Sequence, residues 1–188
     1  MKIARFYALH RKLVIGLLLL TVIATASALV YYSLDLRVVV TSTTPMVIFV
    51  TASDSTSAGA TIGTNSTYAK LTGIKSYPNA TSIYEQALNV SNTDTASHAV
   101  RLRSISITGG STSYGTILIK LTDVTGTVQQ TITYTGGASW GAPSVSPAGF
   151  ISPGIAASTK WSIRVESTLN AGVVAGVTTT IELTIDVQ

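Results

Sequence analysis

The sequence predicts an all-β protein: an antiparallel jelly-roll or β-sandwich domain preceded by an extended N-terminal strand. Eight to ten short segments carry alternating or continuous apolar residues, and clusters of turn residues separate them. No amphipathic helix of useful length interrupts these segments. The 188 residues are enough for one domain with a hydrophobic core. We therefore expect one folded domain built from two packed sheets.

Most of the excess positive charge lies ahead of the first apolar run. The chain has 12 Lys and Arg, of which four come before residue 13, and the remaining eight balance the eight Asp and Glu. The net charge of +4 therefore belongs to the N-terminal segment. A neutral domain has no electrostatic basis for binding nucleic acid, and we expect no nucleic-acid partner.

Residues 1–28 have the three parts of a secretory signal peptide. A basic stretch comes first, residues 13–23 form an apolar core, and a run of small residues follows. Ala26 and Ala28 are the candidate cleavage positions. We predict that this segment is removed on export and that the mature protein is extracellular. Because the chain has no cysteine, the exported domain must draw its stability from its core, its sugars or its neighbours.

Two other interpretations of the hydrophobic segment remain open. Residues 13–32 are twenty mostly apolar residues, enough to span a bilayer as an uncleaved signal anchor, which would be the chain's one contact with a membrane. The same residues would form the retained core helix of a type IV pilin. Against a pilin, Leu13 follows the basic pair, where pilin peptidases prefer a small residue.

Residues 29–44 are predicted to form an N-terminal strand and a linker. Apolar and polar side chains alternate from residue 33 to residue 38, which is the period of a β-strand. Such a strand pairs either within its own domain or with an open sheet edge of the next molecule. We favour the second, because cleavage after export then confines assembly to the outside of the cell. The candidate donor side chains are Leu29, Tyr31, Leu34, Leu36, Val38 and Val40.

The first half of the domain, which we expect to span residues 45–188, contains three predicted strands. Residues 46–50 are consecutive apolar residues and predict a strand buried on both faces. Residues 51–78 are typical of loops, with at most two short strands. Residues 83–91 and 99–108 predict longer strands, and a change of parity in the second predicts a β-bulge near Arg103 or Ser104.

The second half predicts a meander, a long loop and two regular strands. Residues 114–121 and 127–134 are strands joined by a turn, and residues 136–154 form the loop, with Trp140 and Phe150 pinned to the sandwich. The inward residues of the second meander strand are Val128, Ile132 and Tyr134.

The last two predicted strands alternate regularly. Residues 160–166 place Trp161, Ile163 and Val165 inward, and residues 177–187 place their odd-numbered side chains inward.

No catalytic or metal-binding constellation is recognisable. After the signal the one histidine is His98, and beside Asp94 in a strand-entry loop it is typical of a turn or surface residue. The sequence has no His-Glu-x-x-His, no thiol, no Gly-x-Ser-x-Gly and no glycine loop that opens a helix. The carboxylates are scattered one to a segment. We expect a protein that is not an enzyme and has no metal, cofactor or catalytic residue.

Three N-x-Ser/Thr sequons are candidates for N-glycosylation. Asn65 and Asn79 fall in the loop-like region, where an exported chain would display sugars. Asn89 falls in a predicted strand and must point outward between Leu88 and Val90.

Several of these features occur together in one kind of protein. A signal peptide precedes a strand containing Ser33-Leu34-Asp35-Leu36, and residues 88–107 (LNVSNTDTASHAVRLRSISI) read strand, Asn-Thr-x, strand. With these motifs the chain resembles the TasA/camelysin-type biofilm matrix fibre proteins, above all the archaeal bundling pili, and the glycosylated archaeal thread filaments are similar too. The resemblance implies a jelly-roll subunit that inserts its N-terminal strand into the next subunit, and a polymer that bundles and joins cells in a biofilm. Camelysins are described as metalloproteases, but this chain lacks any recognisable set of zinc ligands, so that activity is not carried over.

We therefore expect a structural subunit of a cell-surface filament whose partners are copies of itself, with N-glycans on its surface. Two alternatives stay open. One is the type IV pilin described above. The other is a secreted monomeric sandwich that binds sugar through Trp140, Trp161 and Tyr134.

Overall fold

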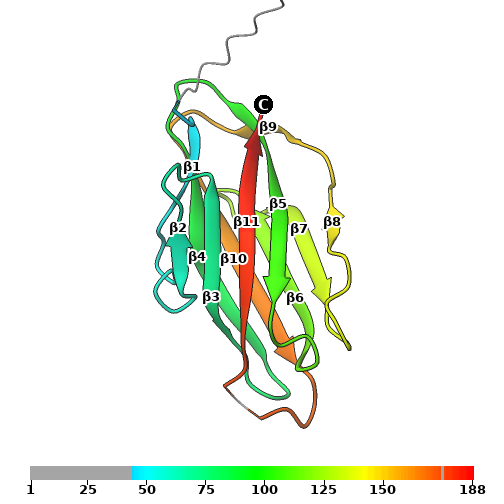
Figure 1. Cartoon of the computed structure of the whole chain (residues 1–188). Coiled ribbons are helices and arrows are strands. Elements are labelled where there is room, and N and C mark those ends of the chain that lie inside the picture. Colours follow the sequence, from blue (N-terminus) through cyan, green and yellow to red (C-terminus); the bar gives the residue numbers. More distant parts are fainter. Residues whose placement is uncertain (1–43, 175) are drawn as a thin grey trace, which may run out of the picture. The chain divides into compact units, whose positions relative to one another are not determined.

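The computed structural model describes residues 44–174 and 176–188 (Figure 1). They belong to one compact unit, Thr43–Gln188. The signal peptide, its cleavage positions and the donor strand predicted for residues 29–40 lie outside the described residues. None of the described segments is a helix of the length and hydrophobicity that a bilayer crossing requires.

The described residues form two antiparallel sheets packed as a sandwich, which confirms the predicted all-β class. One sheet has six strands in the order β1-β4-β10-β6-β7-β8, and the other has five in the order β2-β3-β11-β5-β9. The strands are β1 (Val47–Val50), β2 (Ala60–Ile62), β3 (Tyr68–Lys75), β4 (Thr81–Asn92), β5 (His98–Thr108), β6 (Tyr114–Thr122), β7 (Val128–Thr135), β8 (Ser144–Ser146), β9 (Ile151–Ile155), β10 (Lys160–Leu169) and β11 (Thr178–Val187).

The last two strands of the chain lie at the centres of the two sheets. β10 pairs with β4 and β6, and β11 pairs with β3 and β5, all antiparallel. Figure 1 shows β10 in orange behind β11 in red, with the earlier strands on either side. Each sheet is therefore completed only when the C-terminal strands have paired with strands made much earlier in the chain.

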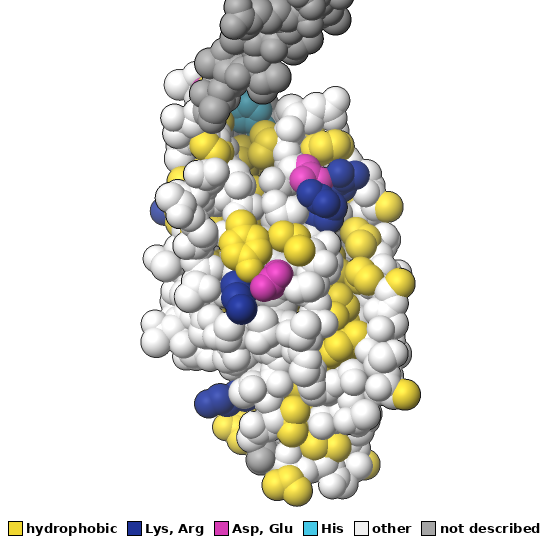
Figure 2. Space-filling view, viewed as in Figure 1, with side chains coloured by type: hydrophobic (Ala, Val, Ile, Leu, Met, Phe, Trp, Pro, Cys, Tyr) yellow, Lys and Arg dark blue, Asp and Glu magenta, His cyan; other side chains and the backbone are white. Residues whose placement is uncertain are grey.

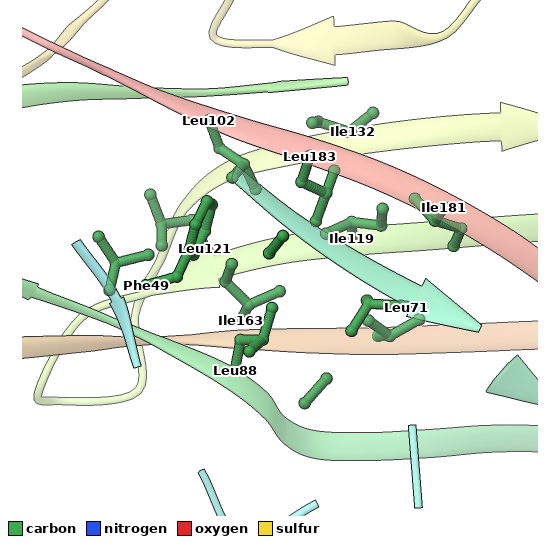
Figure 3. Packing of buried hydrophobic residues seen from close by; sticks show 14 of the residues in the cluster. Phe49, Leu71, Leu88, Leu102, Ile119, Leu121, Ile132, Ile163, Ile181 and Leu183 are labelled. Atoms are coloured by element: carbon green, nitrogen blue, oxygen red, sulfur yellow. The ribbon is translucent and has the colours of Figure 1, made fainter. Parts of the chain in front are cut away.

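Inward side chains of both sheets form one continuous core (Figure 3). On β10 the predicted inward residues Trp161, Ile163 and Val165 are buried, which confirms the alternation predicted there. On β11 the residues at 179, 181, 183 and 185 are buried as predicted, whereas Val187 at the end of the strand is 39% exposed. The two faces meet in the labelled cluster of Phe49, Leu71, Leu88, Leu102, Ile119, Leu121, Ile132, Ile163, Ile181 and Leu183.

The connection from β4 to β5 crosses from one sheet to the other and is held by Asn92, which is buried. Its Nδ2 donates to the carbonyls of Ala96 (2.7 Å) and Ile155 (2.9 Å), and its Oδ1 accepts from the Asp94 N–H at 2.9 Å. The Thr93 N–H donates to the Met46 carbonyl at 2.8 Å. One side chain thus fixes where β5 begins and where β9 ends.

Two predictions for the first half of the domain are corrected by the structure. β1 belongs to one layer of a two-layer sandwich, so only one of its faces packs on the core: Val47 and Phe49 are buried, while Met46 just before the strand is 49% exposed. Residues 51–78 do contain two strands, but β3 is eight residues long rather than short. The sequence did not predict its full length because Thr72 and Gly73, next to each other in the strand, interrupt the apolar alternation.

In the second half, the predicted loop 136–154 contains β8 and the start of β9. Both are short edge strands rich in Ser and Pro, which lack the apolar alternation of longer strands. Trp140 is partly buried against the core, whereas Phe150 is 38% exposed. The bulge predicted in β5 is present, with its register shift between Ser104 and Ser106.

The core predicts one mutational result. Ile119 is fully buried on β6, opposite Val165 on β10 and Ile132 on β7. Ile119→Ala should lower the free energy of unfolding by about 2–5 kcal/mol, because it removes buried methyl groups and leaves a cavity. Chemical denaturation measures this change. Ile83→Ala, at a side chain that is 46% exposed, is the control and should change stability by less than about 0.5 kcal/mol. Equal losses for the two variants would contradict the assignment of the core.

Candidate functional site: the open edge of strand β5

Strand β5 has a complete neighbour on one side and an incomplete one on the other. β11 pairs with β5 from Val100 to Thr108, whereas β9 pairs with it only at His98 and Val100. The eight residues 101–108 therefore have a strand on one side only, within the part of the chain that the structure describes. We call this segment the open edge of β5. Unpaired backbone N–H and C=O groups of this kind are templates for another strand.

The local sequence of β9 explains why the pairing stops. Pro153 lies in the middle of this strand and has no N–H to donate. Gly154 follows with φ +78°, and a Cβ at that position would lie 1.9 Å from the carbonyl oxygen of His98. β9 therefore crosses the start of β5 closely at one end of the domain and does not run along it (Figure 1).

At the first part of the open edge, a side chain takes the place of a strand. Gln130 lies on the inward face of β7 and is 1% exposed. Its Oε1 accepts a hydrogen bond from the backbone N–H of Leu102 at 2.8 Å, and its Nε2 donates to the carbonyl of Pro147 at 2.9 Å. The carboxamide thus satisfies a backbone group that a neighbouring strand would otherwise satisfy.

Two aromatic side chains bridge the remainder of the edge. The Tyr134 hydroxyl donates to Ser104 Oγ, and burial raises the pKa of Tyr134, which keeps the hydroxyl protonated as a donor. Trp140 Nε1 donates to the carbonyl of Gly109 at 2.9 Å, just beyond the end of β5. The rings of Tyr134 and Trp140 meet edge-on, with centroids 6.2 Å apart. This side of the sandwich is therefore bridged by side chains.

The opposite side of the sandwich is bridged partly by backbone and partly by the Tyr84 hydroxyl of β4, which accepts from the Lys75 N–H at 2.9 Å. The Asp54 N–H donates to the Gln86 carbonyl of β4 at 3.0 Å, and the Gly73 N–H of β3 donates to the Ala58 carbonyl at 2.9 Å. Ala58 itself is fully buried. A loop of the chain thus bonds to β3 near Gly73 and to β4 near Gln86, while residues 81–85 of β4, within the described part of the chain, also pair with a strand on one side only. Among the described residues, no loop backbone bonds to residues 101–108 of β5. We therefore take residues 101–108 of β5 as the candidate acceptor of another strand.

Apolar surface accompanies the open edge. Ile105, at the bulge, is 50% exposed, and Trp140 and Val145 are only partly buried against the core. In Figure 2 hydrophobic side chains form an elongated strip on the right of the view, where β5 to β8 lie in Figure 1. A strand laid along β5 would cover part of this apolar surface.

Beside this strip, the outer face of β5 and β11 carries a charged cluster. Arg101 and Arg103 both donate to the Asp186 carboxylate, with Arg101 Nη2 to Oδ2 at 2.6 Å and Arg103 Nη2 to Oδ1 at 3.2 Å. Partial burial would raise the pKa of Asp186, but the hydrogen bonds from the two guanidinium groups outweigh it, so the pKa is lowered. The Arg101 guanidinium also lies 5.0 Å from the Phe150 ring centroid. These contacts hold the outer surface of β5 in place.

The lone histidine lies where the sequence predicted, at the entry to β5. His98 Nε2 lies 2.7 Å from Asp94 Oδ2. This hydrogen bond, with a second from the Thr95 N–H, lowers the pKa of Asp94. The pair closes the turn that starts β5. No group of three potential metal ligands occurs among the described residues.

The predicted glycosylation sites lie on the surface. Asn65 and Asn79 are exposed in the turns before β3 and β4. Asn89 is partly exposed on β4, between the buried Leu88 and Val90, and its Oδ1 accepts from Ser162 Oγ at 3.1 Å. Asn89 therefore has the outward orientation that a glycan at this position would need.

The three aromatic residues proposed for sugar binding are not displayed in a row. Tyr134 is fully buried and Trp161 is 7% exposed. Trp140 packs against Tyr134 and Tyr114, with centroid separations of 6.2 and 6.1 Å. These rings contribute to the core, where stacking on a sugar would require exposed faces.

Sequence reasoning missed Gln130. Its position shares the inward parity of Ile132 and Tyr134, so a polar side chain there interrupts an apolar face. The inward position predicted for Val128 is wrong: this side chain is 45% exposed, next to a register shift between β6 and β7. That interruption was the available signal, because a buried amide requires a specific partner. Which partner it has depends on the packing of β7 under β5.

In comparisons with known proteins, no family model matches the chain, and no curated protein matches it.

The charged cluster predicts an acid-sensitive domain. The carboxylates of Asp94, Asp123, Glu182 and Asp186 have pKa values below their ordinary ones, because hydrogen bonds stabilise the ionised form. A lowered folded-state pKa stabilises the protein above the unfolded-state pKa, and this stabilisation is lost as the pH falls through the folded-state value. The unfolding temperature should therefore fall below about pH 4.5.

Asp186→Asn should reduce this acid dependence and cost about 0.5–1 kcal/mol at pH 7, since the cluster is partly exposed. Thermal unfolding from pH 7 to pH 2.5 measures both effects. Glu85→Gln is the control, because the Glu85 side chain in its ion pair with Arg164 is 63% exposed. An unchanged pH profile in Asp186→Asn would contradict a stabilising role for the cluster.

Proposed function

We propose that the protein is the subunit of an extracellular filament, a jelly-roll domain that completes its five-stranded sheet with residues 29–40 of the next copy. The observation that carries the proposal is the open edge of β5. Eight residues of this strand have a neighbouring strand on one side only, and no loop backbone bonds to them among the described residues. The same chain supplies an apolar, strand-forming segment outside the described domain.

The two segments match in length and chemistry. Residues 101–108 extend about 26 Å, and the twelve residues 29–40 extend about 40 Å at the rise of a β-strand. The segment can therefore pair along the whole open edge and keep residues for a linker. Its apolar side chains would cover apolar surface beside the edge, and its polar side chains would face water.

Simple energetics favour a stable joint. Burying about six large apolar side chains contributes at most roughly 9–18 kcal/mol. About eight new backbone hydrogen bonds add on the order of 0.5–1.5 kcal/mol each. Association costs an estimated 4–15 kcal/mol, together with the ordering of the arm. Burial and hydrogen bonding together thus match or exceed the association cost over most of these ranges.

The direction of donation determines the form of the assembly. A strand given to one neighbour and an edge offered to another are different surfaces, so the contact is heterologous and repeats without end unless the rotation between subunits closes a ring. The product is a head-to-tail fibre. The mature chain is formally neutral, with eight basic and eight acidic residues after the signal, which lowers the repulsion between fibres that bundle. We propose that such bundles hold cells together.

N-terminal sequencing of the mature protein separates this proposal from a type IV pilin. A mature chain that starts near Ser27 or Leu29 has lost the hydrophobic segment that a pilin needs as its core helix. Retention of residues 13–23 would instead favour the pilin.

Removing the donor strand tests the proposal directly. Deletion of residues 29–40 should leave a soluble but less stable domain that does not polymerise, because every subunit then lacks the strand that completes its neighbour. Electron microscopy and analytical ultracentrifugation would measure this. The deleted domain should also bind a synthetic peptide of residues 29–40. Fibres formed by the deletion variant would overturn the proposal.

Two point variants refine this test within the full-length chain. Leu36→Ser removes a large side chain from the apolar face of the strand and should weaken polymers, since about 1.5–3 kcal/mol of burial is lost at each joint. Arg37→Ser alters the opposite face and is the matched control, with little expected effect. The denaturant concentration that dissociates the fibres measures both. Equal sensitivity of the two positions would contradict a one-sided docking of the strand.

A further inference from the structure

Gln130 is placed as a substitute for a strand. Its neighbours on the inward face of β7, Ile132 and Tyr134, are fully buried, so the carboxamide lies at the margin of an apolar core. A polar group buried there is costly unless it is hydrogen-bonded. Its partners are the Leu102 N–H on the open edge of β5 and the Pro147 carbonyl just after β8. One amide side chain thus links the edges of the two sheets.

The chemistry of this link is that of a peptide group. A carboxamide offers a carbonyl oxygen and an N–H, as each unit of a backbone does. At Leu102, Gln130 Oε1 lies at 2.8 Å, the distance at which the carbonyl of a neighbouring strand would accept the same hydrogen bond. Leu102 follows Arg101, the first residue beyond the pairing with β9. A strand that enters the edge next to β9 meets this position first.

We infer that the Gln130 carboxamide occupies, in the free subunit, the place at Leu102 that the backbone of the incoming strand takes on assembly. The inference rests on the proposed function, since its partner is residues 29–40 of a second copy. Gln130 protects the edge by satisfying the Leu102 N–H and must be displaced when the strand enters. It therefore determines how readily a subunit accepts its neighbour, and it limits pairing with wrong strands.

If Gln130 competes with the donor strand, its removal should affect the fibre in the opposite direction from the removal of a residue that only stabilises the domain. A residue that only stabilises the domain would, when removed, weaken the subunit and the fibre alike. A residue that competes with the donor would, when removed, weaken the free subunit but favour strand entry, because the Leu102 N–H is then satisfied only by the donor. Comparing the subunit with the fibre separates the two.

The experiment compares full-length mature chains of wild type, Gln130→Met and Gln129→Met. Methionine keeps the length of glutamine but can neither donate nor accept as an amide does. Gln129 is the matched control on the other face of β7, where its Nε2 donates to Asp123 Oδ2 at 2.7 Å. Fibres are dissociated in denaturant and returned to buffer. We expect the dissociated Gln130→Met subunit to unfold at a lower temperature than wild type, and its fibres to reassemble about five- to thirtyfold faster.

The possible outcomes distinguish a failure of this inference from a failure of the proposed function. Slower or unchanged reassembly of Gln130→Met, or fibres weakened as much as the subunit, would overturn the inference while leaving the filament itself in place. A wild-type chain that stays monomeric would overturn the proposed function and the inference together. If Gln130→Met does not fold, Gln130→Asn makes the same comparison, because it keeps the amide but draws it back by one methylene. Gln129→Met also loses a hydrogen bond, to Asp123, and so controls for the loss of stability; its fibres should reassemble at the wild-type rate.

Discussion

The backbone of a β-strand carries hydrogen-bonding groups on both sides, and the structure depends on where each side finds its partners. Along β5 one side is satisfied by β11, and the other is satisfied by β9 for two residues and then by the Gln130 side chain. Tyr134 and Trp140 add contacts near the far end of the strand. The sandwich is thus packed on its inside and incomplete at one margin.

The position of that margin follows from the order of the strands. β10 and β11 close the centres of the two sheets, so the earlier strands are divided between the sheets and arranged around them. The chain passes from β8 in one sheet to β9 in the other, and Pro153 and Gly154 turn β9 across the start of β5. The end of β5 is left without a chain segment beside it among the described residues. An incomplete margin is therefore built into the topology.

The surface chemistry agrees with a subunit that associates. Charges on the outer faces are paired, as in the cluster of Arg101, Arg103 and Asp186 and in the contact of Lys120 Nζ with Glu166 Oε1 at 2.6 Å. The paired charges keep β5 and its neighbours in register without giving the domain a strong field of one sign. Apolar side chains such as Ile105 remain exposed beside them. A surface of this kind tolerates close approach of a second copy.

Local periodicity determined much of this protein without tertiary information. Alternation over 160–166 and 177–187 predicted the inward faces of β10 and β11, and the change of parity in β5 predicted its bulge. Both could be predicted because side chains of a β-strand alternate between its two faces, a period that is visible in each segment alone. Asn65 and Asn79 were predicted to be exposed because the residues around them have the composition of loops, and both are exposed. The short edge strands β8 and β9 were not predicted, because they lack the apolar alternation from which the longer strands were recognised.

Only the tertiary structure decided which edge is left open and what satisfies it. The sequence marked position 130 as polar on an apolar face, but the partner of Gln130 is Leu102, 28 residues earlier in the chain and in the other sheet. Pairing between sheets depends on long-range packing, and no local period encodes it. The residues before Thr44 supplied the expectation of a donor, and the folded domain supplied a candidate acceptor.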